Sequence, residues 1–227
     1  MRDDQATFGQ PGIGVEPGLA DVFARDVRQD GACMRFTLHL PEAPPQAVTL
    51  NLPGAHNVLN ALAAAAVGWQ LGVAPDAIAR ALESFAGIGR RFNDLGIVTT
   101  HTGARVRLID DYGHHPRELA AVFAAARGGW PDQRLVVAFQ PHRYSRTRDQ
   151  FDAFAAVLSE VDALVLSEVY PAGEAPIPGA DGKALCRAIR SRGAVEPVLH
   201  KSLDELPYVM GLVRQSYERQ MGDGGQA

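Results

Sequence analysis

The spacing of apolar and polar residues changes near the middle of this chain. MRFTLHL (34–40) and AVTLNL (47–52) alternate between apolar and polar positions, which predicts two strands joined by the loop PEAPPQ. The segments at 56–72 and 74–85 instead repeat apolar residues every three or four positions, which predicts two helices, with Gly72 ending the first. Residues 1–32 are rich in Gly, Asp and Gln, and we expect them to be irregular.

In the second part, short apolar segments alternate with helical patterns. Strands are predicted at 105–110, 134–140, 163–169 and 197–200, and helices at 115–129, 146–160, 182–193 and 202–219. Such alternation is typical of an α/β fold, a Rossmann-like and mainly parallel sheet with helices on both faces. The Gly-rich segment at 87–96 is predicted to be a connection, and we place the domain boundary there, giving domains 1–92 and 93–227. The tail at 221–227 is expected to be disordered.

Composition excludes several classes of protein. The 227 residues carry a net charge of −4, which gives no general attraction to nucleic acid or to an anionic membrane. No apolar run reaches the roughly 20 residues that cross a bilayer, and the polar start has no signal-peptide pattern. Cys33 and Cys186 form no CxxC pair, so we expect reduced thiols in a cytoplasmic protein.

The basic residues are almost all arginine. Of the 22 basic residues only Lys183 and Lys201 are lysines, and neither stands in a GxxxxGK[ST] sequence. This sequence therefore contains no phosphate-binding loop of that type.

Polar clusters follow three successive strands of the predicted sheet. DDYGHHP (110–116) follows the first strand of the second part, PHRYSRTRD (141–149) the second, and YPAGEAPIPGAD (170–181) the third. In open α/β sheets, ligands bind beyond the carboxyl ends of the strands. We therefore expect all three clusters along one edge of one sheet, where they form a functional site.

Several of these residues also have structural interpretations. Asp110 and Asp111 could start a turn and cap the following helix. Pro116 suits a first helical turn. His114 and His115 are neighbours that cannot both point the same way, so we expect one functional and one structural histidine.

Two further groups point to anions and nucleotides. Arg143 and Arg146 share a face if a helix starts near 143, and together they suit a carboxylate or a phosphate, whereas Arg148 is expected to be solvated. The second group is His56, Asn57 and Asn60, which begin a predicted helix. They are either a cap with a polar face or a site for a nucleotide base.

At these motifs the sequence resembles the Mur ligase family. DDYGHHP, FQPHRYSRTRD and EVYPAGEAPIPGAD are similar, in this order and spacing along the chain, to the carboxyl-terminal domain of the family's alanine-adding member. PGAHNVLNALAA and GIGRRFN are similar to the end of its central ATP-binding domain. The similarity runs from about Ala6 to about Leu203.

The resemblance implies a cytoplasmic, ADP-forming ligase of peptidoglycan and cell-wall synthesis. It joins L-alanine to UDP-N-acetylmuramate through an acyl phosphate, with ATP and Mg²⁺. It also implies roles for nine residues, with no metal ligand among them. Those at the nucleotide are His56, Asn57, Asn60, Arg91 and Asp111, while those at the substrates are Tyr112, His114, Arg143 and Arg146, of which the last three are expected to be catalytic.

The sequence also departs from the family pattern. The family's UDP-binding domain and phosphate-binding loop precede the matched region, so we expect that this polypeptide does not ligate alone. The partial central domain is expected to self-associate through uncovered apolar surface. Asn93 stands where the family has an acid.

Two other classes of function stay open at this point. The first is a non-catalytic module that binds a nucleotide or a partner subunit. The second is a metal-dependent phosphoesterase, in which His142 and Glu174 would add to the acids and histidines of DDYGHHP.

Overall fold

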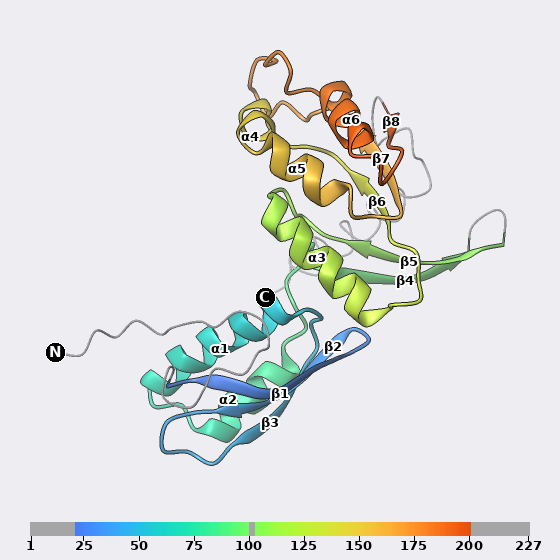
Figure 1. Ribbon diagram of the computed structural model, residues 1–227. Helices are drawn as coiled ribbons and strands as arrows, with labels where there is room; N and C mark the ends of the chain where they lie inside the picture. The colour runs from blue at the N-terminus through green and yellow to red at the C-terminus, as the bar shows by residue number, and fades with distance from the viewer. Residues whose placement is uncertain (1–20, 100–102, 201–227) are drawn as a thin grey trace, which may run out of the picture. The chain divides into compact units, whose positions relative to one another are not determined.

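The computed structural model describes residues 21–99 and 103–200, which fall into two compact units (Figure 1). Unit 1 comprises the described residues up to Gly87 together with Ala124–Pro131, and unit 2 comprises the others. Across these described ranges, no helix is both long and apolar enough to cross a membrane. Cys33 and Cys186 are both free thiols, as predicted.

Unit 1 is a small sheet packed against two helices. Strands β1 (Phe23–Asp30), β2 (Cys33–His39) and β3 (Gln46–Leu50) form an antiparallel sheet in that order. Helices α1 (Ala55–Gln70) and α2 (Pro75–Ser84) share its apolar core, which includes Leu38, Leu50 and Val58. The two predicted strands and two predicted helices are confirmed, and Gly72 follows the end of α1 with a φ of 80°.

The expectation of an irregular segment up to residue 32 is wrong for 23–30, which forms β1. Only Ala24 of this strand is buried, because β1 lies at the edge of the sheet. The register also shifts between Arg25 and Arg28, beside Asp26 with its positive φ of 54°. An exposed, bulged edge strand lacks the apolar alternation on which the prediction depends.

Unit 2 contains two sheets. Strands β4 (Asn93–Thr99) and β5 (Arg105–Asp110) pair antiparallel, and β6 (Val136–Phe139), β7 (Ala163–Ser167) and β8 (Val198–His200) form a parallel sheet in that order. Its helices are α4 (Tyr144–Asp149), α5 (Phe151–Leu158), α6 (Gly182–Ser191) and the first part of α3 (Pro116–Gly129), which belongs to unit 1 from Ala124 onward. Phe154, Leu164 and Leu185 are fully buried in its core. The predicted α/β class with a parallel sheet is confirmed.

Three expectations for this unit need correction. Residues 93–96 belong to β4 rather than to a connection, because a bulge between Asp94 and Gly96 accommodates the glycine within the strand. Strand β5 pairs with β4 and is not part of the β6–β7–β8 sheet. The single helix predicted at 146–160 is two helices, broken at Gln150. The predicted helix at 202–219 and the tail lie outside the described residues.

Candidate functional site

The loop after β5 is held by Asp111. One carboxylate oxygen accepts a hydrogen bond from the backbone N–H of Gly113 at 2.6 Å, and the other accepts one from Phe92 at 2.7 Å. The first bond closes a local turn, and the second joins this loop to the GRRF segment 19 residues earlier. Asp111 therefore does not cap α3, and each oxygen retains a lone pair for a ligand.

The GRRF segment also contacts the loop through Arg90. The backbone N–H of Tyr112 donates to the carbonyl of Arg90 at 2.7 Å, and the guanidinium lies 4.8 Å from the Tyr112 ring centroid. Arg90 also lies 3.6 Å from the carboxylate of Asp110. Burial raises the pKa of Asp110, and the charge of Arg90 opposes that rise. Arg90 and Phe92 both have a positive φ, at 60° and 47°, so this contact holds a strained backbone.

Glu118, in the first turn of α3, organises the two histidines. Its Oε2 accepts hydrogen bonds from the backbone N–H groups of His114 at 2.9 Å and His115 at 3.1 Å. Burial alone would raise the pKa of Glu118, but these bonds and the nearby His114 and Arg91 side chains lower it. The ring Nδ1 of His115 accepts from the backbone N–H of Arg117 at 3.3 Å, which gives His115 a structural role.

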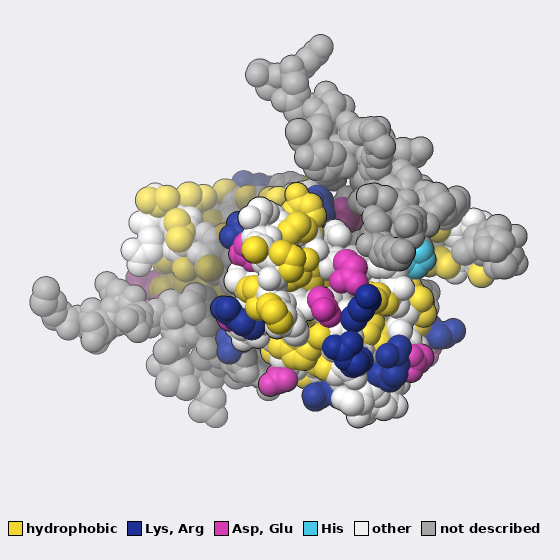
Figure 2. All heavy atoms as spheres, turned by 90° about the horizontal axis from the view of Figure 1, so that it is seen from above, with side chains coloured by type: hydrophobic (Ala, Val, Ile, Leu, Met, Phe, Trp, Pro, Cys, Tyr) yellow, Lys and Arg dark blue, Asp and Glu magenta, His cyan; other side chains and the backbone are white. Residues whose placement is uncertain are grey.

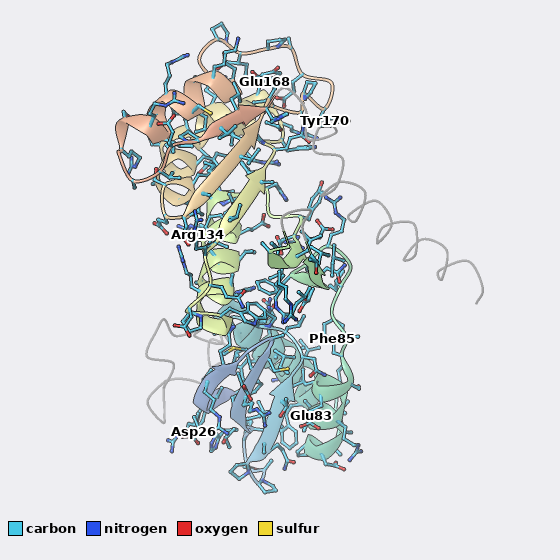
Figure 3. All side chains as sticks on the ribbon, turned by 90° about the vertical axis from the view of Figure 1, so that its right-hand side faces the viewer. Asp26, Glu83, Phe85, Arg134, Glu168 and Tyr170 are labelled. Carbon is cyan, nitrogen blue, oxygen red and sulfur yellow. The ribbon has the colours of Figure 1, made fainter. Side chains whose placement is uncertain are left out.

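The loop after β6 contacts the loop after β7. His142 and Tyr170 pair in a parallel bridge, and their rings stack with centroids 5.3 Å apart. The backbone N–H of Arg143 donates to the carbonyl of Tyr170 at 2.9 Å. Figure 3 shows Tyr170 and Glu168, which both follow β7, at the same end of this unit. The second and third polar clusters of the sequence are therefore in direct contact.

Arg143 and Arg146 flank the start of α4. The helix begins at Tyr144, so Arg143 precedes it as the N-cap, with a φ of 74° and a ψ of 135°. Arg146 lies within the helix and donates from Nη1 to the carbonyl of His142 at 3.2 Å. Arg143 is exposed and Arg146 is half-buried. Both guanidiniums lie near His142, because the charge of each acts on its ring.

The first polar cluster lies close to the other two. Burial lowers the pKa of His142, and the positive charges of Arg146, Arg143 and His114 lower it further, against the effect of Glu174. His114 comes from the β5 loop, so all three loops contribute charge at one place. The expectation that all three clusters lie along one edge of one sheet is wrong for the first cluster, because β5 belongs to a different sheet from β6 and β7.

Glu174 links the loop after β7 to α4 through hydrogen bonds. Its two carboxylate oxygens accept from the backbone N–H of Ser145 at 2.9 Å and from the Ser145 hydroxyl at 2.7 Å. The two residues are 29 positions apart, and no local pattern in the sequence relates them. Both oxygens of Glu174 are thus engaged by Ser145, next to Arg143.

We expect the hydrogen bonds between Ser145 and Glu174 to weaken in acid. The two hydrogen bonds from Ser145 lower the pKa of Glu174 below its ordinary value of 4.5, so their stabilising effect is complete above that pH and is lost as the pH falls through the lowered value. Ser145→Ala removes one donor and should move the Glu174 titration, followed by NMR of its carboxyl carbon, back toward the ordinary value. Ser159→Ala is the control, because the Ser159 hydroxyl bonds to Ala155. An unchanged Glu174 titration in Ser145→Ala would contradict the assignment.

In unit 1, the predicted base-binding residues begin α1. The N-cap of this helix is Gly54, with a φ of 92° and no side-chain cap. Asn57 donates from Nδ2 to the carbonyl of Pro53 at 2.7 Å, and Asn60 donates to the Oδ1 of Asn57 at 3.4 Å. His56 is half-buried and Asn60 is exposed. The three side chains therefore form a polar surface at the helix start, and none of them serves as the N-cap.

A residue that the sequence analysis missed supports this helix start. Gln29 of β1 accepts the backbone N–H of Gly54 at 3.2 Å and donates to the carbonyls of Gly31 at 3.0 Å and Ala125 at 2.8 Å. A Cβ on Gly54 would lie 2.9 Å from the Cβ of Ala125, so glycine is required there. Gln29 thus fixes the backbone from which His56 and Asn57 project.

On the face that Figure 2 shows, the charged side chains of the described residues are of both signs. Basic side chains in Figure 2 lie next to acidic ones and among apolar side chains, and Arg190 and Arg148 pair with Glu196 and Asp149. Within residues 21–99 and 103–200, no group of three or more His, Cys, Asp or Glu side chains is placed to hold a metal ion.

Known proteins resemble this chain in sequence. A family profile described as "Mur ligase, glutamate ligase domain" matches residues 90–217. The UDP-N-acetylmuramate–L-alanine ligase of Xanthomonas axonopodis pv. citri (strain 306) is 79% identical over 196 residues, which are 86% of this chain and 41% of that protein. The ligase of the same name from Xanthomonas campestris pv. campestris (strain B100) is 83% identical over 180 residues, or 79% of this chain and 38% of that protein. The chain thus spans about two fifths of the length of these relatives.

Solved structures resemble it in fold. The UDP-N-acetylmuramate–alanine ligase of Thermotoga maritima superposes with a TM-score of 0.68 at 26% identity, covering 90% of this chain and 46% of that one. A folylpolyglutamate synthase of Mycobacterium tuberculosis, solved with ADP and AMPPCP, gives a TM-score of 0.59 at 17% identity. It covers 90% of this chain and 43% of that one, and at this identity it shows a shared fold alone.

Proposed function

The chain belongs to the Mur ligase family, and on that premise we propose that it supplies part of an ADP-forming ligase that joins L-alanine to UDP-N-acetylmuramate in peptidoglycan synthesis. One observation carries the proposal. His114, Arg143 and Arg146, from two loops at strand ends, place their charges around His142 in a chain that is 79% identical to a relative of that name. Because the reaction consumes ATP and a UDP-linked sugar, we propose that the protein acts in the cytoplasm.

We propose that the two arginines bind the anionic centre of the reaction. The substrate carboxylate takes the terminal phosphoryl group of ATP, and the resulting acyl phosphate carries negative charge on its oxygens. Guanidinium groups match such oxygens in geometry and charge, and they stabilise charge that builds as phosphate leaves. Arg143 is exposed, so a ligand can reach it, while Arg146 donates a hydrogen bond to the His142 carbonyl.

We assign His114 to the incoming amine. L-Alanine must lose a proton from its ammonium group before the nitrogen can attack, and an imidazole titrates near neutrality. Tyr112 packs edge-on against His114, with ring centroids 5.2 Å apart, and is 43% exposed. We propose that Tyr112 forms an adjacent wall of the alanine site.

The nucleotide residues fit ATP, whereas the described residues offer no magnesium site. Asn60 and Arg91 are exposed, and Asp111 keeps free lone pairs for a ribose hydroxyl. We propose that these residues, with His56 and Asn57, bind the adenosine part of ATP. When bound, ATP supplies the phosphoryl group that activates the carboxylate. No residue is assigned to Mg²⁺, since no described group of acids or histidines fits it.

Phosphate release tests this proposal. The purified chain is incubated with ATP, Mg²⁺, UDP-N-acetylmuramate and L-alanine, with each substrate omitted in turn. We expect no release, because no lysine stands in a phosphate-binding loop in this sequence. A chimera, in which this chain replaces the matching 196 residues of the Xanthomonas axonopodis pv. citri ligase, should release phosphate only with all three substrates. A correctly folded chimera that stays inactive would contradict the proposal.

The same experiment separates the alternatives. A nucleotide-binding module would bind ATP while its chimera stays inactive. A phosphoesterase would release phosphate without ATP, but both Glu174 oxygens are engaged by Ser145 and the described residues lack a metal cluster.

The apolar side chains of Val67 and Leu71 are 61% and 78% exposed. We propose that they cause self-association of the isolated chain.

A further inference from the structure

One carboxylate, Glu118, contacts both proposed halves of the site. Its Oε2 lies 3.4 Å from Nδ1 of His114, the proposed base, and its Oε1 lies 3.4 Å from Nη1 of Arg91, a proposed nucleotide residue. Its side chain is one-third exposed, so these charges interact while ligands can still reach them.

The surroundings of His114 fix which ring nitrogen carries the proton. Nδ1 lies 3.2 Å from the carbonyl oxygen of Tyr112 and 3.4 Å from the Glu118 carboxylate. Both neighbours are acceptors, so they favour the neutral ring that carries its hydrogen on Nδ1. The lone pair is then on Nε2, where a proton can be accepted.

We propose that Glu118 is a positioning residue that holds His114 as the Nδ1–H tautomer and links its basicity to the occupancy of the nucleotide site. This inference rests on the proposed function. In the proton transfer, the ammonium of L-alanine gives one proton to Nε2, and the resulting imidazolium keeps its Nδ1–H toward Glu118. The carboxylate stabilises that positive charge in the same way that a carboxylate orients a catalytic histidine elsewhere.

Arg91 shares the same carboxylate, which creates the link. The positive charge of Arg91 offsets part of the negative field that Glu118 exerts on His114. A nucleotide that engages Arg91 withdraws that charge from Glu118, so His114 becomes a stronger base when the nucleotide is bound. Among the described residues, Tyr112 packs against His114, and His142 feels the charge of His114 together with those of Arg143 and Arg146.

NMR of the imidazole nitrogens in the 227-residue chain tests the inference without any catalysis. The wild type should show the Nδ1–H tautomer of His114. Glu118→Gln keeps an oxygen that accepts from the loop backbone but removes the charge, so the His114 titration midpoint should fall by roughly half a pH unit. Arg91→Ala should raise the midpoint. Glu42→Gln, which removes an exposed charge in unit 1, is the matched control and should leave it unchanged.

The outcomes are distinct. If Glu118→Gln leaves the midpoint where it is, Glu118 only orders the loop and the inference is overturned. Added ATP should raise the midpoint in the wild type and raise it less in Glu118→Gln. If Arg91→Ala raises the midpoint but ATP does not, the Glu118 link stands and the proposed nucleotide role of Arg91 fails.

Discussion

Replacing Arg143 or Arg146 with alanine in the chimeric ligase is expected to slow ligation by about a hundredfold to a thousandfold. That is the size of effect seen when one donor to a developing negative charge is removed. Both guanidiniums lie beside His142, and within residues 21–99 and 103–200 neither forms a salt bridge with a carboxylate, so their charge is available to an anionic ligand. The rate of phosphate release at saturating substrates measures the effect.

Arg148 is the matched control for this experiment. It lies on the same helix, but its guanidinium pairs with Asp149 at 2.7 Å. Arg148→Ala should leave ligation nearly unchanged. Arg143→Lys should restore little activity, because an ammonium lacks the planar fork of a guanidinium. Equal losses in the Arg143 and Arg148 variants would show that the charge of the helix matters rather than its placement.

The backbone at Arg143 supports a functional reason for this residue. Its φ of 74° and ψ of 135° are close to those of Gly54, which has the equivalent N-cap position on α1 with 92° and 137°. A non-glycine residue pays about 1–3 kcal/mol for such a conformation. Arg143→Gly should therefore stabilise the fold while the ligation rate falls. A gain in stability together with a loss of activity is expected for a strained functional residue.

The sequence predicted the elements that are written as apolar runs or as regular repeats of apolar residues. The parallel strands β6, β7 and β8 are short apolar runs, and α1 repeats its apolar residues at helical spacing, so both were found. Strands β1 and β4 were missed because each is exposed along much of its length and contains a bulge. Apolar patterning is the signal in the sequence, and β1 and β4 carry little of it.

The candidate site likewise contains residues that a local pattern in the sequence could reveal and residues that it could not. The motifs after β5, β6 and β7 were predicted to converge because strand ends meet at one edge of a sheet. Glu118 had a local signal, since His115 and Glu118 stand at the spacing of a capping box. Glu174 and Gln29 had none, because Ser145 is 29 residues from Glu174, and Gly54 and Ala125 are 25 and 96 residues from Gln29. Only the folded chain brings these residues together.

Asp111→Ala is expected to destabilise unit 2 by about 3 kcal/mol. The variant leaves the backbone N–H groups of Phe92 and Gly113 without their carboxylate acceptor, and hydrogen bonds to a charged group are worth about 1.5–3 kcal/mol each. Phe92 is nearly buried, so water does not easily replace the lost acceptor. Urea unfolding measures the change, and hydrogen exchange should accelerate at the amides of Phe92 and Gly113.

The same variant distinguishes two roles for Asp111 in nucleotide binding. If Asp111 acts chiefly by holding the GRRF segment, Asp111→Ala lowers stability and ATP affinity together, because Arg91 loses its fixed backbone. Asp111→Asn, which supplies one acceptor oxygen in place of two, should then lie between the wild type and alanine on both scales. Asp132→Ala, an exposed turn residue of the same unit, should change neither. Weaker ATP binding at unchanged stability would instead indicate a direct contact between Asp111 and the ribose.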